Sequence, residues 1–258
     1  MGINFHHEKT GRSYTTRNAD DSWVNAIKRL VPIDTIKHAA DIGCGGGIYS
    51  KALCDLGVQS VVGVDFSEPI LEGAIKNCRD YPNISFKNGN AYHSGLESGG
   101  YDLLLERALV HHLDDLQTCF DEGYRVLKDD GYYIVQDRTP EDCLVKGDAS
   151  HIRGYFFEVF PRLIEKETSR RHSSQYVIET LKNAGFREIQ EVKLWEIRQV
   201  FAHKDHLLKD LSERTGRSIL HELDDQELNQ LVEYIDKQIL IEENIVEQDR
   251  WTIWKAVK

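Results

Sequence analysis

Apolar positions along residues 38–137 alternate between short continuous runs and stretches with helical spacing. The runs HAADIGC, VQSVVGVDF, ISFKNGNA, YDLLLERA and GYYIVQD predict strands, because they are short and rich in β-branched or aromatic residues. The stretches GIYSKALCDLG, SEPILEGAIKNCRDY and LQTCFDEGYRVLKDDG predict helices, because apolar residues recur three or four positions apart. This alternation predicts an α/β fold, a Rossmann-like doubly wound sheet with helices on both faces.

Capping residues place several boundaries of these helices. Ser67 is a candidate N-cap, and Pro69 suits the first turn that follows it. Gly57 and Gly131 stand where a glycine would end a helix. We therefore expect the second helix to begin after Ser67 and the third to run up to Gly131.

The pattern changes after residue 138. SSQYVIETLKNAGF predicts a helix that Gly185 ends, and REIQEVKLWEIRQVF predicts a strand. In the polar helical stretch 202–243, Asp224 and Glu227 form a helix start signal, and DRWTIWKAVK alternates like a strand. We interpret 1–258 as one domain with an N-terminal arm (1–30), a core (38–138), a lid or substrate segment (139–173) and a helical insertion (202–243).

Composition and charge narrow the class of protein. The 258 residues carry a formal net charge of −11, which argues against a nucleic-acid backbone as partner. Five scattered cysteines without a C-x-x-C pair predict neither a disulfide framework nor a metal site, and favour a reduced, cytoplasmic protein. No apolar run approaches about 18 residues, so no membrane association is expected. The oligomeric state stays open.

A glycine-rich turn joins the first predicted strand to the first helix in the pattern D-x-G-x-G-x-G. Backbone amides at such a turn form a binding site for a ligand. The dinucleotide pattern G-x-G-x-x-G fails in both registers, because its third glycine is replaced by Ile48 or Ser50. The turn therefore favours a ligand other than a dinucleotide.

Two acids flank this turn. Asp41, at the end of the first strand, suits a ligand that carries an ammonium group rather than a pyrophosphate. Asp65, at the end of the second strand, can accept hydrogen bonds from both hydroxyls of a ribose. A ligand with a ribose, an ammonium group and no phosphate points to S-adenosyl-L-methionine.

The order and spacing of these motifs over residues 38–138 resemble those of the class I S-adenosylmethionine-dependent methyltransferases. The resemblance implies a seven-stranded sheet with an antiparallel last strand. It implies that the turn holds the methionyl part of the cofactor, that Asp65 holds the ribose, and that Asn90, in NGNA, replaces the usual acid at the adenine amino group. The implied cofactor-binding residues are Asp41, Gly43, Cys44, Gly45, Asp65, Phe66, Asn90, Ala91, Glu106, Tyr14 and Arg17.

Three residues at or just after the end of the fourth strand have open roles. Glu106 ends an apolar strand and needs a partner, either the ammonium group of the cofactor or the neighbouring Arg107. His111 and His112 are either a helix-start pair with one ring packed and one exposed, or His111 faces the cofactor or acts as a base. Catalytic residues thus stay undetermined, with His111 and Arg107 as candidates.

Two further segments have alternative interpretations. The arm with Tyr14 and Arg17 either folds over the cofactor or lies on the surface. In a cluster of basic and aromatic residues, the charges either form a solvated face, or the segment is a lid whose aromatics wall a pocket and whose cations hold an anionic substrate group. Its members are Arg138, His151, Arg153, Tyr155, Phe156, Phe157, Phe160, Arg170, Arg171 and His172.

The expected activity is in-line methyl transfer to a small organic acceptor, with an anionic acceptor as one option. Such a reaction needs alignment and water exclusion, and a base only when the nucleophile arrives protonated. Nucleobase amines are disfavoured because ERAL, after the fourth strand, lacks the prolines of the enzymes that methylate them. The alternatives are a non-catalytic cofactor-binding platform and a nicotinamide-dependent oxidoreductase.

Overall fold

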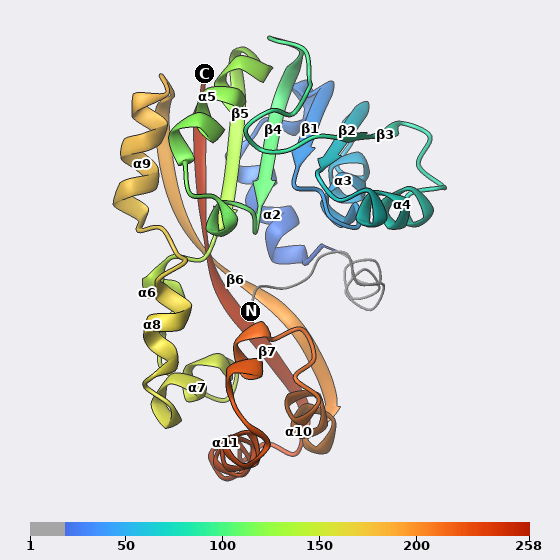
Figure 1. The fold of residues 1–258 in the computed structure, drawn as a ribbon. Coiled ribbons are helices and arrows are strands. Elements are labelled where there is room, and N and C mark those ends of the chain that lie inside the picture. Colours follow the sequence, from blue (N-terminus) through green and yellow to red (C-terminus); the bar gives the residue numbers. More distant parts are fainter. Residues whose placement is uncertain (1–18) are drawn as a thin grey trace. The chain divides into compact units, whose positions relative to one another are not determined.

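The computed structural model describes residues 19–258 and contains one seven-stranded sheet in the order β3-β2-β1-β4-β5-β7-β6 (Figure 1). The candidates Tyr14 and Arg17 lie outside the described residues. The strands are β1 (His38–Ile42), β2 (Ser60–Asp65), β3 (Ile84–Asn88), β4 (Tyr101–Arg107), β5 (Leu127–Asp137), β6 (Arg187–His203) and β7 (Glu243–Val257).

Strands β1 to β5 pair in parallel, and β7 pairs antiparallel with β5 from Tyr132↔Val257 to Asp137↔Thr252. This topology confirms the predicted doubly wound sheet and its antiparallel last strand. The strand order reverses beside β1, because β2 lies on one side of it and β4 on the other. In such sheets, ligands bind at the carboxyl ends of the strands at this switch point.

The helices of the described chain complete the α/β pattern. They are α2 (Asp21–Leu30), α3 (Ile48–Asp55), α4 (Glu68–Asn77), α5 (Leu116–Val126), α6 (Pro140–Cys143), α7 (Arg153–Val159), α8 (Leu163–Thr168), α9 (Ser174–Asn183), α10 (Lys204–Ser212) and α11 (Asp225–Gln238), with short 3-10 turns η1 (Ile33–Thr35), η2 (Val110–His112) and η3 (Ser218–Glu222).

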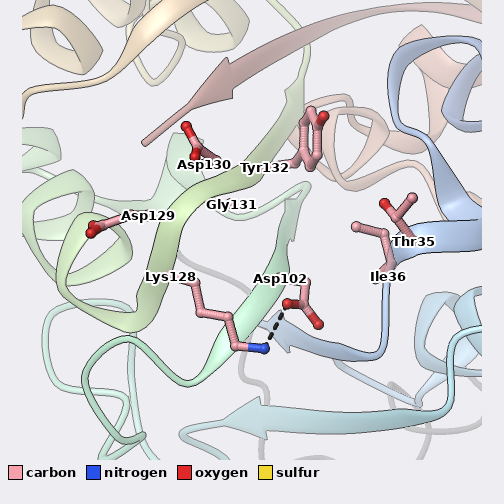
Figure 2. A pocket seen from close by; sticks show the side chains of 8 residues that line it. All are labelled: Thr35, Ile36, Asp102, Lys128, Asp129, Asp130, Gly131 and Tyr132. Atoms are coloured by element: carbon pink, nitrogen blue, oxygen red, sulfur yellow. Dashed lines mark hydrogen bonds and ion pairs between the residues drawn. The ribbon is translucent and has the colours of Figure 1, made fainter.

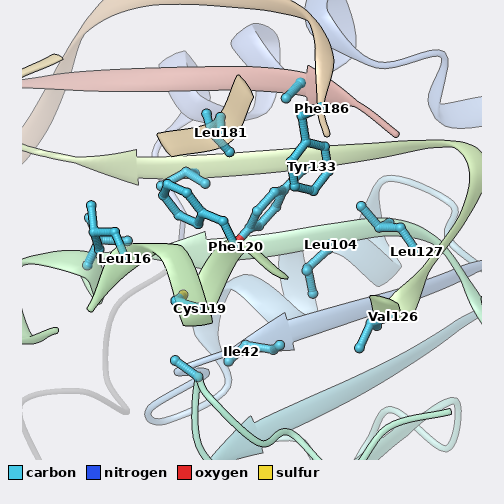
Figure 3. Packing of buried hydrophobic residues seen from close by; sticks show 14 of the residues in the cluster. Ile42, Leu104, Leu116, Cys119, Phe120, Val126, Leu127, Tyr133, Leu181 and Phe186 are labelled. Carbon is cyan, nitrogen blue, oxygen red and sulfur yellow. The ribbon is translucent and has the colours of Figure 1, made fainter. Parts of the chain in front are cut away.

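The main core lies between the sheet and helices α5 and α9 (Figure 3). Leu104 and Tyr133 project from the strands, and Phe120 from α5 meets the ring of Tyr133 edge-on at 5.8 Å. Successive strand residues face opposite sides of a sheet, so the neighbours of these residues face the other side. This alternation determines which helix each candidate side chain contacts.

The helix boundaries follow most of the predicted signals. Helix α4 begins after Ser67 with Pro69 in its first turn, and Gly57 follows α3 with a φ of 104°. Gly185 follows α9 with a φ of 100°. The prediction for Gly131 was wrong: α5 ends at Val126, and Gly131 lies inside β5, where a Cβ would come within 2.8 Å of the carbonyl oxygen of Lys128.

The chain divides into two compact units. Among the described residues, the first comprises 19–137, 173–192 and 252–258, and the second comprises 138–172 and 193–251. The second unit has its own apolar core from α7, α8, α10 and α11, in which Tyr155, Phe156 and Phe157 are buried. Helix α11 begins with the predicted box, in which Asp224 and Glu227 each accept from the other's backbone N–H.

Candidate active site

The glycine turn follows β1 and begins α3. Gly43, Gly45 and Gly47 all have left-handed backbones, with φ of 75°, 53° and 76°. The N–H groups of Gly43 and Cys44 donate to the carbonyl of Val64, at 2.7 and 3.0 Å, which fastens the turn to β2. Other residues adopt this conformation only at a cost of roughly 1–2 kcal/mol, which explains why the turn is made of glycine.

Gly45 and Asp65 form the centre of the candidate site. The N–H of Gly45 donates to Oδ2 of Asp65 at 3.0 Å, and Ser67 N–H donates to Oδ1 at 3.0 Å. Among residues 19–258, a Cβ added to Gly45 would meet no atom within 4 Å apart from its chain neighbours, whereas one on Gly47 would lie 2.7 Å from Sγ of Cys78. The surface of the turn at Gly45 is therefore open, and the glycine there leaves room for a ligand beside the carboxylate.

Burial raises the pKa of Asp65, partly offset by the N–H groups of Ser67 and Gly45. Each carboxylate oxygen has two lone pairs, so a carboxylate that accepts two N–H groups can still accept two hydroxyls. The carboxylate is thus fixed in position while it keeps the capacity to bind a diol.

Asp41 faces α3 and is buried. Its Oδ2 accepts a hydrogen bond of 2.6 Å from Oγ of Ser50. Burial raises the pKa of Asp41 to about 6, and the nearby Asp65 carboxylate adds to the increase, while Arg107 opposes it. A second cationic group, such as an ammonium, would lower this pKa again and hold the acid in its charged form.

Phe66 and Asn90 lie next to this pair along the chain. Phe66 is 55% exposed, which is unusual for a large apolar side chain at the end of a buried strand. Oδ1 of Asn90 accepts from the N–H groups of Tyr92 and His93, both at 2.9 Å, while Ala91 is buried. The amide oxygen of Asn90 therefore shapes the turn 90–93, and both of its lone pairs are used there.

Glu106 lies on the face of the sheet that α5 covers. It is fully buried, and Sγ of Cys119 donates to its two oxygens at 3.5 and 3.3 Å. Burial raises the pKa of Glu106 to about 7. Arg107, one of the two partners that the sequence suggested for Glu106, faces the other side of the sheet. Cys119 is a partner that the sequence did not suggest.

Arg107 faces α3, where its guanidinium lies 4.2 Å from the centre of the Tyr49 ring. The Tyr49 ring meets Trp23 of α2 edge-on at 4.8 Å, and Trp23 is fully buried. Arg107 also lowers the pKa of Asp41 electrostatically. Arg107 therefore affects the charge of Asp41 at the end of β1. Through Tyr49 it is also connected to Trp23 of helix α2.

His111 and Asp137 form a hydrogen-bonded pair. Nδ1 of His111 lies 2.8 Å from Oδ2 of Asp137, and its backbone N–H donates to the same oxygen at 3.3 Å. A carboxylate only accepts, so Nδ1 carries the proton and Nε2 of the neutral ring carries the lone pair. Ala108, with a φ of 52°, turns the chain from β4 into η2 and so brings His111 to the end of β5.

Asp137 was missed in the sequence, although a signal was available. It ends β5 just as Asp65 ends β2, and Asp41 is the residue before the last of β1. Because carboxyl ends of parallel strands meet at one edge of a sheet, an acid there is a candidate partner for a histidine after the neighbouring strand. The side chain of Asp137 is 2% exposed and that of His111 is 12% exposed.

The basic and aromatic segment after β5 belongs to the second unit. Arg153 and Arg171 are buried at 7% exposure, so a solvated face is the wrong interpretation for these two side chains. The aromatic residues Tyr155, Phe156 and Phe157 pack into the core of that unit. Whether this segment selects a substrate stays a prediction.

A small cavity of about 120 Å³ lies at the opposite, amino-terminal ends of the strands (Figure 2). Its acid Asp102 already accepts from the N–H groups of Lys37 and His38, at 3.0 and 2.8 Å, and from Nζ of Lys128 at 2.6 Å. These contacts fasten β4 to β1 and β5. We therefore interpret the cavity as part of the packing between these strands and not as a ligand site.

Comparison with known proteins identifies a methyltransferase domain in this chain. Residues 40–135 match the family model described as a methyltransferase domain. The chain is 30% identical over 115 residues to an uncharacterized methyltransferase, YcgJ, of Bacillus subtilis, a match that covers 43% of this chain and 45% of that protein. The chain spans less than half the length of the first curated relatives that it matches.

Solved structures share the fold. A candidate methyltransferase from an antibiotic biosynthesis pathway of Anabaena variabilis has a TM-score of 0.69 at 21% identity, with 93% of this chain and 98% of that chain covered. The phosphoethanolamine N-methyltransferase 2 of Haemonchus contortus, solved with S-adenosyl-L-methionine, has a TM-score of 0.60 at 19% identity, with 99% and 58% covered.

Within residues 19–258, no helix is both long and apolar enough to cross a membrane. The match at residues 40–135, the strand order and the glycine turn that joins β1 to α3 agree with one another. Residues 40–135 therefore match a methyltransferase domain, and the chain shares the fold of solved methyltransferase structures.

Proposed function

We propose that this protein binds S-adenosyl-L-methionine and transfers its methyl group to a small organic acceptor. The observation that carries the proposal is the open backbone at Gly45, whose N–H is fixed by Asp65 at 3.0 Å. A turn of this shape leaves space for a ligand next to a carboxylate that can bind a diol. The residues present therefore fit the cofactor that the family uses.

Each cofactor-binding residue has a proposed role. Asp65 accepts the ribose hydroxyls, Phe66 packs against adenine, and the turn from Asp41 to Gly45, with Cys44 as a packed residue, holds the methionyl end. Since the oxygen of Asn90 is used in its own turn, we assign the adenine edge to its amide nitrogen and to the backbone of Ala91. Glu106 acts as a buried acid beneath the proposed site, at the end of β4. Tyr14 and Arg17, in the N-terminal arm, remain predicted contacts of the cofactor.

The cofactor, when bound, supplies a methyl group on a positively charged sulfur. The chain then has to orient the acceptor, exclude water and receive a proton if the acceptor is an alcohol, phenol or ammonium group. We assign the proton transfer to Nε2 of His111, because Asp137 holds the ring through Nδ1. Asp137 is a positioning residue that favours this tautomer and stabilises the ring once it is charged.

We propose that the segments 139–173 and 202–243 select the acceptor and that the acceptor carries a negative charge. The abundance of arginine in the second unit supports a negative charge on the acceptor. The acidic net charge of −11 supports a small molecule over a nucleic acid. Five free cysteines support a reducing, cytoplasmic location.

Calorimetric titration of the full chain with S-adenosylhomocysteine, S-adenosylmethionine and NAD tests the cofactor. We expect saturable binding of the first two with a micromolar Kd and none of NAD. Transfer of labelled methyl groups across a panel of small hydroxyl, amine and carboxylate acceptors tests the activity. Binding without turnover on any acceptor would favour a non-catalytic platform, and binding of NAD alone would refute the proposal.

A further inference from the structure

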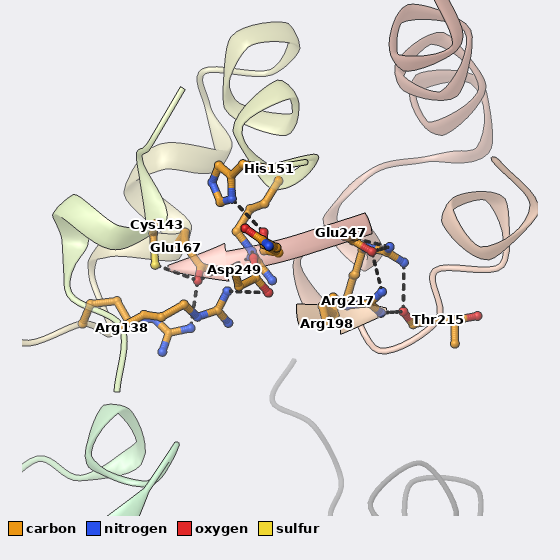
Figure 4. Close-up of polar contacts among 12 residues, drawn as sticks. Arg138, Cys143, His151, Glu167, Arg198, Thr215, Arg217, Glu247 and Asp249 are labelled. Carbon is orange, nitrogen blue, oxygen red and sulfur yellow. Dashed lines mark hydrogen bonds and ion pairs between the residues drawn. The ribbon is translucent and has the colours of Figure 1, made fainter. Parts of the chain in front are cut away.

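The second unit contains two buried clusters of ion pairs (Figure 4). The Glu247 cluster consists of Arg198, Asp210, Arg217 and Glu247. The Glu167 cluster consists of Arg138, Arg153, Glu167, Arg170, Arg171 and Asp249. The ion pairs of the first cluster join two arginines to two carboxylates, and those described here for the second join Glu167 and Asp249 to several arginines.

In the Glu247 cluster the contacts are short and reciprocal. Nη2 of Arg217 donates to both oxygens of Glu247, at 3.0 and 2.7 Å, and its Nη1 bonds Asp210. Arg198 donates to Glu247 at 2.8 Å. Buried charges are tolerated when they are matched and hydrogen-bonded, so this cluster is explained by structure alone.

In the Glu167 cluster the carboxylate is surrounded by donors. Glu167 accepts from Arg170 at 2.6 Å, from Arg171 at 2.8 Å and from Sγ of Cys143 at 3.4 Å. Burial alone would raise the pKa of Glu167, but the guanidinium groups of Arg153 and Arg171 hold it well below its usual range. One carboxylate thus serves several cations.

Arg153 is less well served. Its Nε lies 3.3 Å from Oδ1 of Asp249, and its Nη1 is 3.7 Å from Glu167, beyond hydrogen-bond distance. Arg153 is 7% exposed, and its Nη1 and the Nε of Arg170 are buried atoms that find no hydrogen-bond acceptor within residues 19–258. Arginine does not lose its proton in proteins, so these donors cannot be neutralised by titration.

A buried donor without an acceptor is costly, and native structures usually satisfy it with a water or an ion. An oxyanion offers several acceptors and a negative charge, which would satisfy the buried donors Nη1 of Arg153 and Nε of Arg170. Guanidinium groups also match the planar and bidentate geometry of carboxylate and phosphate oxygens.

We propose that the Glu167 cluster is a binding site for an oxyanion, a carboxylate or phosphate group of a small molecule. Its assignment to the methyl acceptor rests on the proposed function, whereas oxyanion binding itself does not.

The test compares full-length variants by melting temperature and calorimetry in inorganic phosphate, methyl phosphate, acetate or chloride at equal ionic strength. We expect phosphate or acetate to bind the wild type saturably and raise its melting temperature above that in chloride. Arg170→Gln, at a side chain 32% exposed, should weaken this binding about tenfold, as expected for the loss of a charged hydrogen bond. Arg162→Gln, with the same change of charge in the exposed pair with Glu227, should not weaken it.

A second variant covers the case in which Arg170→Gln does not fold. Glu167→Gln removes the negative charge that competes with an oxyanion for these arginines, so phosphate should raise its melting temperature more than that of the wild type. Tighter binding of methyl phosphate than of inorganic phosphate would indicate a group carried by a small molecule, and the reverse would indicate the free ion. Equal melting temperatures of the wild type in all four anions would refute the site.

Parallel titration with S-adenosylhomocysteine separates the two proposals. Binding of the nucleoside without any oxyanion binding would refute the Glu167 site and leave the proposed cofactor site intact. Oxyanion binding without nucleoside binding would refute the proposed function and leave the Glu167 site intact.

Discussion

The backbone N–H of Gly45 and the carboxylate of Asp65 are joined by a hydrogen bond of 3.0 Å across 20 residues of sequence. This bond fixes the open part of the glycine turn against the end of β2. Both parts of the candidate cofactor site therefore hold their positions before any ligand arrives, which lowers the entropy cost of binding.

Gly45→Ala should abolish cofactor binding at a modest cost in stability. The new methyl group has no atom of residues 19–258 beyond its chain neighbours within 4 Å but occupies the space proposed for the ligand, and the left-handed φ of 53° costs roughly 1–2 kcal/mol. Gly99→Ala is a matched control, since Gly99 has a φ of 62° and open space as well. Equal affinity of both variants for S-adenosylhomocysteine in calorimetry would contradict the assignment.

Asp65→Asn should raise the Kd for S-adenosylhomocysteine at least about tenfold. The amide replaces one acceptor oxygen by a donor, so either the Gly45 N–H or a ribose hydroxyl loses its partner. Asp55→Asn, at a surface acid that accepts from the Tyr81 hydroxyl at 3.0 Å, should leave the Kd unchanged. A normal Kd for Asp65→Asn would move the ribose away from this acid.

His111→Gln and Asp137→Asn should each lower kcat by about 10² or more on a hydroxyl or amine acceptor, with little change in affinity for S-adenosylhomocysteine. In Asp137→Asn the new side-chain amide can donate to Nδ1, which would favour the tautomer with its proton on Nε2. The exposed neighbour His112, whose ring lies 3.9 Å from that of His111, provides the control His112→Gln. If His112→Gln lost as much activity, the dyad would have no special role.

Proton NMR provides an independent check on the same pair. The wild type should show a slowly exchanging imidazole N–H signal from Nδ1 of His111, because a buried carboxylate 2.8 Å away accepts its proton. The signal should disappear in Asp137→Asn. Its persistence there would mean that another group holds the ring.

Glu106 should make the fold less stable as the pH rises. Burial raises its pKa from 4.5 to about 7, so between these values the folded chain keeps a proton that the unfolded chain releases. Its contribution is complete below pH 4.5 and is lost as the pH passes 7, a loss of roughly 3 kcal/mol. Urea denaturation of Glu106→Gln should therefore show a smaller decline, and the raised pKa of Asp41 accounts for part of what remains.

Glu122 provides a control of opposite sign. Burial alone would raise its pKa, but hydrogen bonds from Arg125 and Ser94 lower it to about 2. Its contribution is present above pH 4.5 and is lost as the pH falls toward 2. Glu122→Gln should thus flatten the acid side of the stability profile and leave the decline above pH 4.5 unchanged.

Local patterns were sufficient to predict the cofactor half of the fold. Short apolar runs and capping residues located β1 to β5, and Asp224 with Glu227 located the start of α11. Gly131 misled the prediction because the left-handed residue that turns the chain is its neighbour Asp130, with a φ of 63°. A glycine in sequence does not show whether its conformation or its lack of a side chain is what the fold needs.

The contacts that join distant residues could not be predicted in this way. The pairing of His111 with Asp137 depends on the register between β4 and β5 and on the left-handed Ala108, and neither has a local signal. The Glu167 cluster likewise joins α7 and α8 to β7, nearly a hundred residues further along the chain. The sequence indicated which residues could carry charge or chemistry, but their partners could be identified only in the folded structure.

The antiparallel pairing of β7 with β5 has a consequence during synthesis. The register from Tyr132↔Val257 to Asp137↔Thr252 means that one edge of β5 has no partner strand until residues 252–257 have left the ribosome. An unpaired edge with Ile134 and Val135 is prone to pair with other chains. A nascent chain stalled shortly before Thr252 should therefore depend on chaperones far more than one released after Val257.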